Sequence, residues 1–188
     1  MKNVKCISKM LALLLALGIV FTTAVACAEE DPFVFFKTAI SGHFEPVETR
    51  EIPIGDHMVL RLPAYWEPSP DSDVSNDWLV YQGADETADC ILLITWEYDL
   101  EYQYEQFLSE LKDRGYTPYN VTKGDFQWQG FYIQEQQTIL VLHKDSNSIA
   151  YAIGLRYEGQ EPAPDSPITR DFNCILTTFM PVNQAASL

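Results

Sequence analysis

Apolar residues follow several different spacings along this chain, and each spacing predicts a particular kind of element. The stretch Cys90–Trp96 is apolar at nearly every position, which is typical of a strand buried on both faces. Residues 99–114 carry apolar side chains at helical spacing, with Asp99 as the N-cap and Gly115 as the C-terminal stop. A second amphipathic helix is expected after Ser166, where a proline occupies the first turn. The pattern predicts a buried sheet with helical cover.

Other stretches have the alternation and the turn residues of β-hairpins. Residues 47–54 and 57–62 flank Gly55-Asp56, and residues 137–143 and 148–157 flank a polar turn. Further strands are expected at 78–81, 117–121 and 126–134, and a short helix is expected at 32–41.

The last predicted strand, 148–157, has one face of bulky side chains and one face of small ones. The small face carries Ala150, Ala152 and Gly154, over which a helix could approach the sheet closely. The elements together predict an α+β fold, a three-layer α/β/α sandwich with a largely antiparallel sheet. We assign this domain to residues 45–181, a tether with the short helix to 29–44, and a tail to 182–188.

Residues 1–28 have the features of a bacterial signal peptide that is removed on export. A basic start precedes an apolar run at 10–21, which is too short for a comfortable membrane span. Two alternatives remain for the cleavage site. An ordinary signal peptidase could cut after Ala28 and release the protein, or Cys27 could be the lipid attachment site, since residues 24–27 resemble a lipobox. We therefore expect an extracytoplasmic protein, either secreted or anchored to the membrane as a lipoprotein.

The negative net charge argues against some classes of binding partner. The chain has 188 residues and a formal net charge of −15, and its composition is 47% hydrophobic, which argues against disorder. Such acidity argues against nucleic acid as a partner and against direct adsorption to anionic lipid, so we expect membrane attachment only through Cys27. Cys90 and Cys174 are expected to be unpaired thiols, because the first begins a buried strand and the second lies away from the apolar face of its helix.

Three stretches resemble the PsbP-like superfamily. They are Leu62-Pro63-Ala64-Tyr65-Trp66 after the first hairpin, the amphipathic helix 99–114, and the closing helix Asp171–Phe179, with Thr178 where serine is usual. This resemblance implies an α/β/α sandwich over roughly residues 45–181. Characterised members of the superfamily act by binding other proteins, so the resemblance brings no catalytic residues with it and implies a protein partner.

Candidate chemistry is sparse. His43, His57 and His143 lie far apart with no companion at metal-ligand spacing. Residues 71–77 place oxygen-bearing side chains at alternate positions, as a calcium loop does, but Asn76 stands where such a loop needs glycine. We also find no nucleophile elbow or phosphate-binding loop. The sequence predicts no metal, no cofactor and no enzyme.

Aromatic residues supply the remaining candidates. Phe126–Tyr132 alternates rings with glutamines, and exposed rings beside amides suit stacking on sugars or anchoring a partner. Core packing is the alternative for these rings, and it is the expected position of Trp78 and Trp96. The predicted function is an exported, non-catalytic protein-binding domain at the cell envelope. The alternative is a glycan-binding or small-molecule-binding module that uses Tyr65, Trp66, Trp128 and Tyr132.

Overall fold

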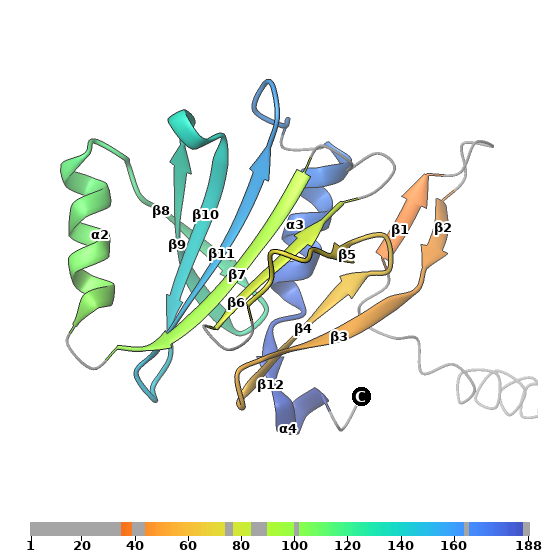
Figure 1. Ribbon diagram of the computed structural model, residues 1–188, viewed down its shortest axis with the longest axis horizontal. Helices are drawn as coiled ribbons and strands as arrows, with labels where there is room; N and C mark the ends of the chain where they lie inside the picture. The colour runs from red at the N-terminus through yellow and green to blue at the C-terminus, as the bar shows by residue number, and fades with distance from the viewer. Residues whose placement is uncertain are drawn as a thin grey trace, which may run out of the picture. The chain divides into compact units, whose positions relative to one another are not determined.

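The computed structural model describes residues 35–38, 44–73, 77–83, 90–99, 102–163 and 166–185. Its largest element is an antiparallel sheet of seven strands (Figure 1). In spatial order the strands are β5 (Glu67–Pro68), β6 (Trp78–Gln82), β7 (Cys90–Tyr98), β11 (Ile149–Tyr157), β10 (Thr138–Lys144), β9 (Phe126–Ile133) and β8 (Tyr119–Lys123).

Two smaller sheets and three helices complete the described chain. One sheet has the order β12 (Met180–Pro181), β4 (Met58–Pro63) and β3 (Thr49–Ile54), and the other pairs β1 (Phe35–Thr38) with β2 (Phe44–Val47). The helices are α2 (Gln103–Asp113), α3 (Pro167–Thr177) and the short α4 (Val182–Ala185), and a 3₁₀ turn covers Gln134–Gln136. None of these described helices is long and apolar enough to cross a membrane.

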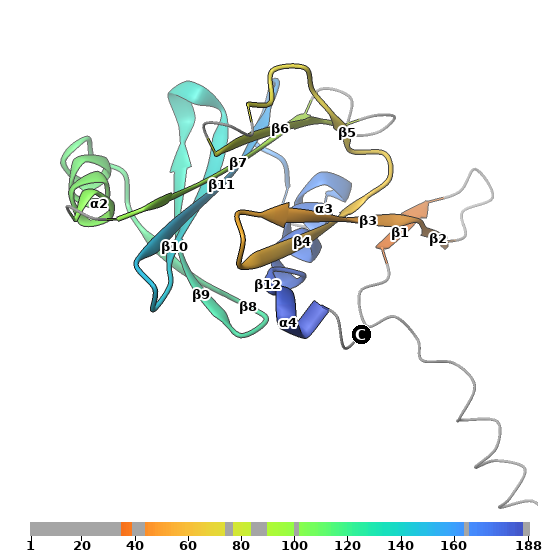
Figure 2. The same cartoon turned by 60° about the horizontal axis from the view of Figure 1, so that its bottom comes forward.

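The inner core lies between the seven-stranded sheet and the β3–β4–β12 sheet, with α3 beside the latter (Figure 2). β11 is central to it, because Ile153 pairs with Ile94 of β7 on one side and with Val141 of β10 on the other. The residues of this core include Ile54, Leu60, Leu62, Leu92, Ile94, Ile153, Leu155, Phe172, Ile175 and Leu176.

The outer core lies on the opposite face of the large sheet, under α2. Leu108 and Leu111 of this helix pack against Phe131, Ile133 and Leu142 of β9 and β10. α2 thus lies at the side of the sheet that contains β9 and β10, as Figure 1 shows.

The expected three-layer α/β/α sandwich is wrong. The molecule is mostly β, with a seven-stranded sheet and a three-stranded sheet that share a core as in a β-sandwich. The error concerns the first hairpin, which the sequence analysis placed in a single main sheet. Its strands β3 and β4 form a separate sheet that packs against the inner face of β7. A helix was expected to cover this face. The burial predicted for both faces of β7 is confirmed only for the inner face, because Ile91, Leu93 and Thr95 on the outer face are half-buried. A second sheet can bury the inner face as well as a helix can.

The short helix expected at 32–41 is also wrong for the residues described there. Residues 35–38 form β1, which pairs with β2, and Phe35 is buried in the inner core. A helix of ten residues is marginal by itself, so strand pairing and burial of a phenylalanine outweigh its helical spacing. The signal peptide and Cys27 lie outside the described residues. Residues 182–185 of the predicted tail form α4.

Both long helices and both hairpins are confirmed. α3 begins as predicted, with the Ser166 hydroxyl accepting a hydrogen bond from the Thr169 N–H at 3.3 Å. α2 begins later than predicted, at Gln103, and its N-cap is Tyr102 and not Asp99. The buried carboxylate of Asp99 still accepts a hydrogen bond from the Tyr104 N–H at 3.1 Å and pairs with Lys144.

Side-chain hydrogen bonds join the closing helix to β4 and to the turn that follows β4. The Tyr65 hydroxyl donates to the Asp171 carboxylate in the first half of α3. Just beyond the helix, Thr178 is fully buried, and its hydroxyl accepts a hydrogen bond from the Arg61 N–H at 2.8 Å. Two of the stretches that carry the PsbP-like resemblance are therefore in direct contact.

Candidate functional site

The small-residue face of β11 is only partly covered by α2. Ala152 packs against the outer core, as the prediction of a closely approaching helix requires. Gly154 differs, because a Cβ there would first meet Thr138, Leu93 and Leu140 of the same sheet, at 3.5 Å or more. The helix lies over β9 and β10, so part of the sheet surface is left open beside it.

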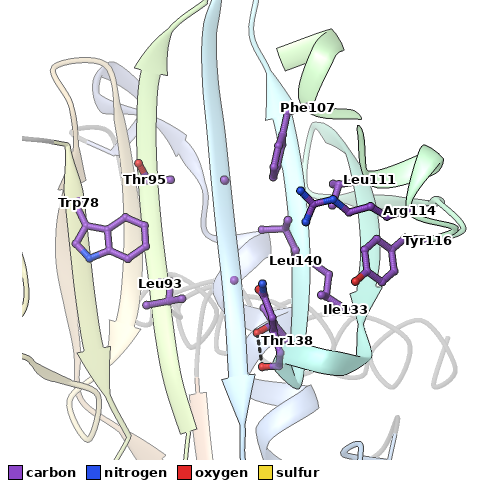
Figure 3. A pocket seen from close by; sticks show the side chains of 13 residues that line it. Trp78, Leu93, Thr95, Phe107, Leu111, Arg114, Tyr116, Ile133, Thr138 and Leu140 are labelled. Atoms are coloured by element: carbon purple, nitrogen blue, oxygen red, sulfur yellow. Dashed lines mark hydrogen bonds between the residues drawn. The ribbon is translucent and has the colours of Figure 1, made fainter. Parts of the chain in front are cut away.

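This open surface is the floor of a pocket of about 190 Å³, shown in Figure 3. The floor consists of Leu93, Thr95, Leu140, Ala152 and Gly154. One wall is Trp78 of β6, and the opposite wall is formed by Phe107 and Leu111 of α2. Trp78 and Phe107 are 36% and 42% exposed, so both rings present apolar surface to the solvent. Covering apolar surface of this kind with a ligand lowers the free energy of the system.

The polar groups of the pocket gather at the end nearest the C-terminus of α2. They belong to Arg114, Tyr116, Gln136 and Thr138. The Thr138 hydroxyl donates to the Gln136 carbonyl at 2.9 Å and is thereby satisfied within the protein. In Figure 3 the guanidinium of Arg114 points inward from the helix side, toward Leu140 and Phe107.

Helix termination positions these polar groups. Gly115 has a φ of 90°, a conformation that favours glycine, and its N–H donates to the Lys112 carbonyl at 2.9 Å. The Tyr116 N–H likewise donates to the Leu111 carbonyl at 3.1 Å. The chain therefore reverses sharply after Arg114 and brings Tyr116 back to the pocket. The predicted C-terminal stop at Gly115 is confirmed, and it has a role in shaping the site.

Tyr116 is engaged by a neighbouring carboxylate. Its hydroxyl donates to the Glu135 carboxylate at 2.6 Å. This hydrogen bond raises the pKa of Tyr116 and lowers the pKa of Glu135, because it favours the phenol and the carboxylate over their alternative protonation states. Arg114 is different, since none of the described carboxylates pairs with it. It is the one charged side chain among the thirteen lining residues.

The arrangement suits binding better than chemistry. The ionisable groups that line the pocket are a guanidinium and a phenol, and the lining offers no nucleophile beside a general base. An apolar cavity of about 150 Å³ can hold benzene, so about 190 Å³ suits a ligand group of roughly that size. The site can accommodate a small apolar group with a polar end directed at Arg114.

The aromatic residues proposed from the sequence lie elsewhere. Trp66 and Trp128 are 0% and 1% exposed, so their ring faces are in contact with protein. Trp128 packs against Phe179, with 5.0 Å between ring centroids. Tyr65 and Tyr132 are half-buried, the first bonded to Asp171 and the second to the Tyr157 hydroxyl. The structure places these four candidate residues at the inner core and does not bring them to the pocket.

Two pocket residues were misjudged or missed from the sequence. Trp78 was expected in the core, but it lies opposite Thr95 on the face of β6 that Leu79 and Tyr81 do not use. Arg114 was not considered at all. Its spacing was the available signal, because Arg114 follows Phe107 and Leu111 by seven and three residues and so continues their helix face.

A second pocket of about 170 Å³ lies at the turn of the first hairpin. Its lining includes His57, with Asp56, Asp77 and Glu97. Across the described residues, no group of three or more His, Cys, Asp or Glu side chains is arranged to hold a metal ion. Among the described residues, Cys90 is buried and Cys174 is exposed, and neither forms a disulfide bond, as predicted.

Comparison with protein-family models finds no match for this chain, and comparison with curated proteins finds none either. The resemblance to the PsbP-like superfamily therefore stays a prediction.

Proposed function

We propose that this protein is a non-catalytic binding protein of the cell envelope, which holds a small apolar ligand in the pocket between α2 and the seven-stranded sheet. The observation that carries the proposal is the half-buried apolar floor around Gly154, bounded by the exposed rings of Trp78 and Phe107. Concave apolar sites with a few convergent polar groups are the usual form of small-molecule sites. Because the chain is strongly acidic, an exposed apolar surface stands out against the rest of its composition.

Export and anchoring belong to the same proposal. The leader at residues 1–28 supports delivery across the membrane, and Cys27 would decide between an anchored and a released form. Both features lie outside the described residues and rest on the sequence alone.

A protein partner is the second candidate, and one observation favours it. Tyr98 and Tyr102 are 62% and 72% exposed, near the junction between β7 and α2. Tyrosine is enriched in protein interfaces because its ring offers contact area at low entropic cost. The PsbP-like resemblance also supports a protein partner.

The pocket is tested by filling its floor. We expect Gly154→Leu to prevent binding, because the Cβ itself meets ordinary contacts of 3.5–3.9 Å while the rest of the side chain occupies the cavity. Ala150→Leu is the matched control, since Ala150 lies on the same face of β11 outside the pocket lining. The probe is toluene, added to the full-length chain and followed by nuclear magnetic resonance.

The expected result is a set of saturable shifts at the Trp78 indole N–H and at the methyl groups of Leu93 and Leu140. These shifts should be absent in Gly154→Leu and present in Ala150→Leu, with equal thermal stability in both variants. Toluene shifts that persist in Gly154→Leu would overturn the proposed site. Failure of the wild-type protein to bind toluene would do the same.

A further inference from the structure

Resting on the proposed binding function, we infer that the pocket selects small amphipathic carboxylates. The apolar group of such a ligand lies on the floor formed by Leu93, Leu140 and Gly154, and its carboxylate pairs with Arg114. The apolar floor alone does not favour a carboxylate over other polar groups. The preference depends on the positive charge of Arg114 at one end of the pocket.

The first argument is that Arg114 is available. Its guanidinium points inward from the helix side of the pocket, and none of the described carboxylates forms an ion pair with it. Glu135 also carries a charge at this end of the pocket, and its carboxylate accepts the hydrogen bond from Tyr116. A guanidinium presents a planar fork of donors that matches a carboxylate, so a ligand carboxylate can form two parallel hydrogen bonds with Arg114.

The second argument concerns the end of α2. Free carbonyls at a helix C-terminus repel anions, which would work against a carboxylate at this position. Here the carbonyls of Glu110, Leu111 and Lys112 accept hydrogen bonds from the backbone N–H groups of residues 114–116. Capping of these carbonyls reduces the repulsion that the helix end would otherwise exert on a carboxylate paired with Arg114.

The third argument is size. A volume of about 190 Å³ accommodates one aromatic ring or a short aliphatic chain, and it is below the range usual for drug-sized ligands. A ring on the floor, joined to a carboxylate by two or three carbon atoms, has a length suited to reaching Arg114.

The probes for this inference are three compounds with the same apolar body. They are 3-phenylpropanoate, 3-phenylpropanol and 3-phenylpropylamine, each titrated into the full-length chain at pH 7 and followed at the Trp78 indole N–H. We expect the carboxylate to bind about tenfold more tightly than the alcohol, since a charge-assisted bidentate pair adds to the shared apolar contact. The amine should bind most weakly. The preference for the carboxylate should shrink as salt concentration rises.

Arg114→Gln removes the charge while keeping a side chain of similar length. We expect this variant to bind carboxylate and alcohol equally, with the affinity for the alcohol unchanged. The matched control is Lys112→Gln, which removes the same charge from an exposed position of the same helix outside the pocket lining. It should keep the preference, because Arg114 lines the pocket and Lys112 does not, although both residues are exposed.

The outcomes separate this inference from the proposed function. Equal affinity for carboxylate and alcohol in the wild-type chain, or a preference that survives in Arg114→Gln, overturns the carboxylate inference and leaves apolar binding intact. Loss of the preference in Lys112→Gln as well would assign it to net charge and also overturn the inference. Failure of all three compounds and of toluene to bind overturns the proposed function itself.

Discussion

The Thr178 hydroxyl provides a sensitive test of how the closing helix is held. It is fully buried, accepts a hydrogen bond from the Arg61 N–H at 2.8 Å and donates to the Ile175 carbonyl at 2.7 Å. Thr178→Val keeps the shape of the side chain and removes both bonds. The Ile175 carbonyl keeps a partner, because the Thr178 N–H also donates to it at 3.0 Å. The N–H of Arg61, in β4, loses the Thr178 hydroxyl as its acceptor, and this loss is the main cost.

Leaving a buried donor without its acceptor costs about 1–3 kcal/mol, so Thr178→Val should lower the free energy of unfolding by about that amount. Urea denaturation measures this change, with an unchanged m-value showing that the unfolded state is unaffected. Thr178→Ser is the control, because it keeps the hydroxyl and loses one methyl group, at a cost of about 1 kcal/mol.

Hydrogen exchange distinguishes the two variants even where their stabilities are similar. The Arg61 amide should lose protection in Thr178→Val and keep it in Thr178→Ser, because only the serine retains the acceptor. A valine variant as stable as the wild type, with the Arg61 amide still protected, would refute the reasoning. The contact between α3 and β4 would then depend on apolar packing alone.

Three further predictions concern titratable and reactive groups. Burial lowers the pKa of His143 below its ordinary value of 6.5, so the unfolded state binds the proton more readily and stability should fall as the pH drops below about 6.5. His143→Phe should flatten this part of a stability profile measured by urea denaturation. The hydrogen bond from Lys144 lowers the pKa of Asp99, so Lys144→Met should raise that pKa, seen by carboxyl chemical shifts, and should destabilise the fold. Cys174 should react with a thiol reagent in the folded protein, although slowly, because partial desolvation of the thiol raises its pKa. Cys90 should react only after unfolding. Peptide mapping by mass spectrometry measures both reactions.

Local signals in the sequence predicted local structure well. The cap at Ser166, the stop at Gly115 and the turn at Gly55 each depend on a few neighbouring residues, and the structure confirms all three. These features are readable because caps and turns require particular side chains or backbone conformations at fixed positions.

The sheet that each strand joins and the position of α2 on the large sheet could not be predicted in the same way. Alternation in β3 shows that one face of this strand is buried, but it does not say which sheet the hairpin joins. The pocket escaped prediction for the same reason. Its existence depends on where α2 lies across the sheet, and the spacing of Leu108 and Leu111 shows only that the helix packs against something apolar.

The position of β11 sets the order in which the large sheet can be completed. β6 and β7 pair with each other, β8, β9 and β10 pair in sequence, and β11 joins the two groups although it follows both in the chain. Until residues 149–157 have emerged, β7 and β10 each present an unpaired edge, and the inner core lacks its central strand. The two halves of the sheet therefore cannot become one cooperative unit before most of the chain is present. Final folding of the large sheet is therefore delayed until the chain is present to about residue 157.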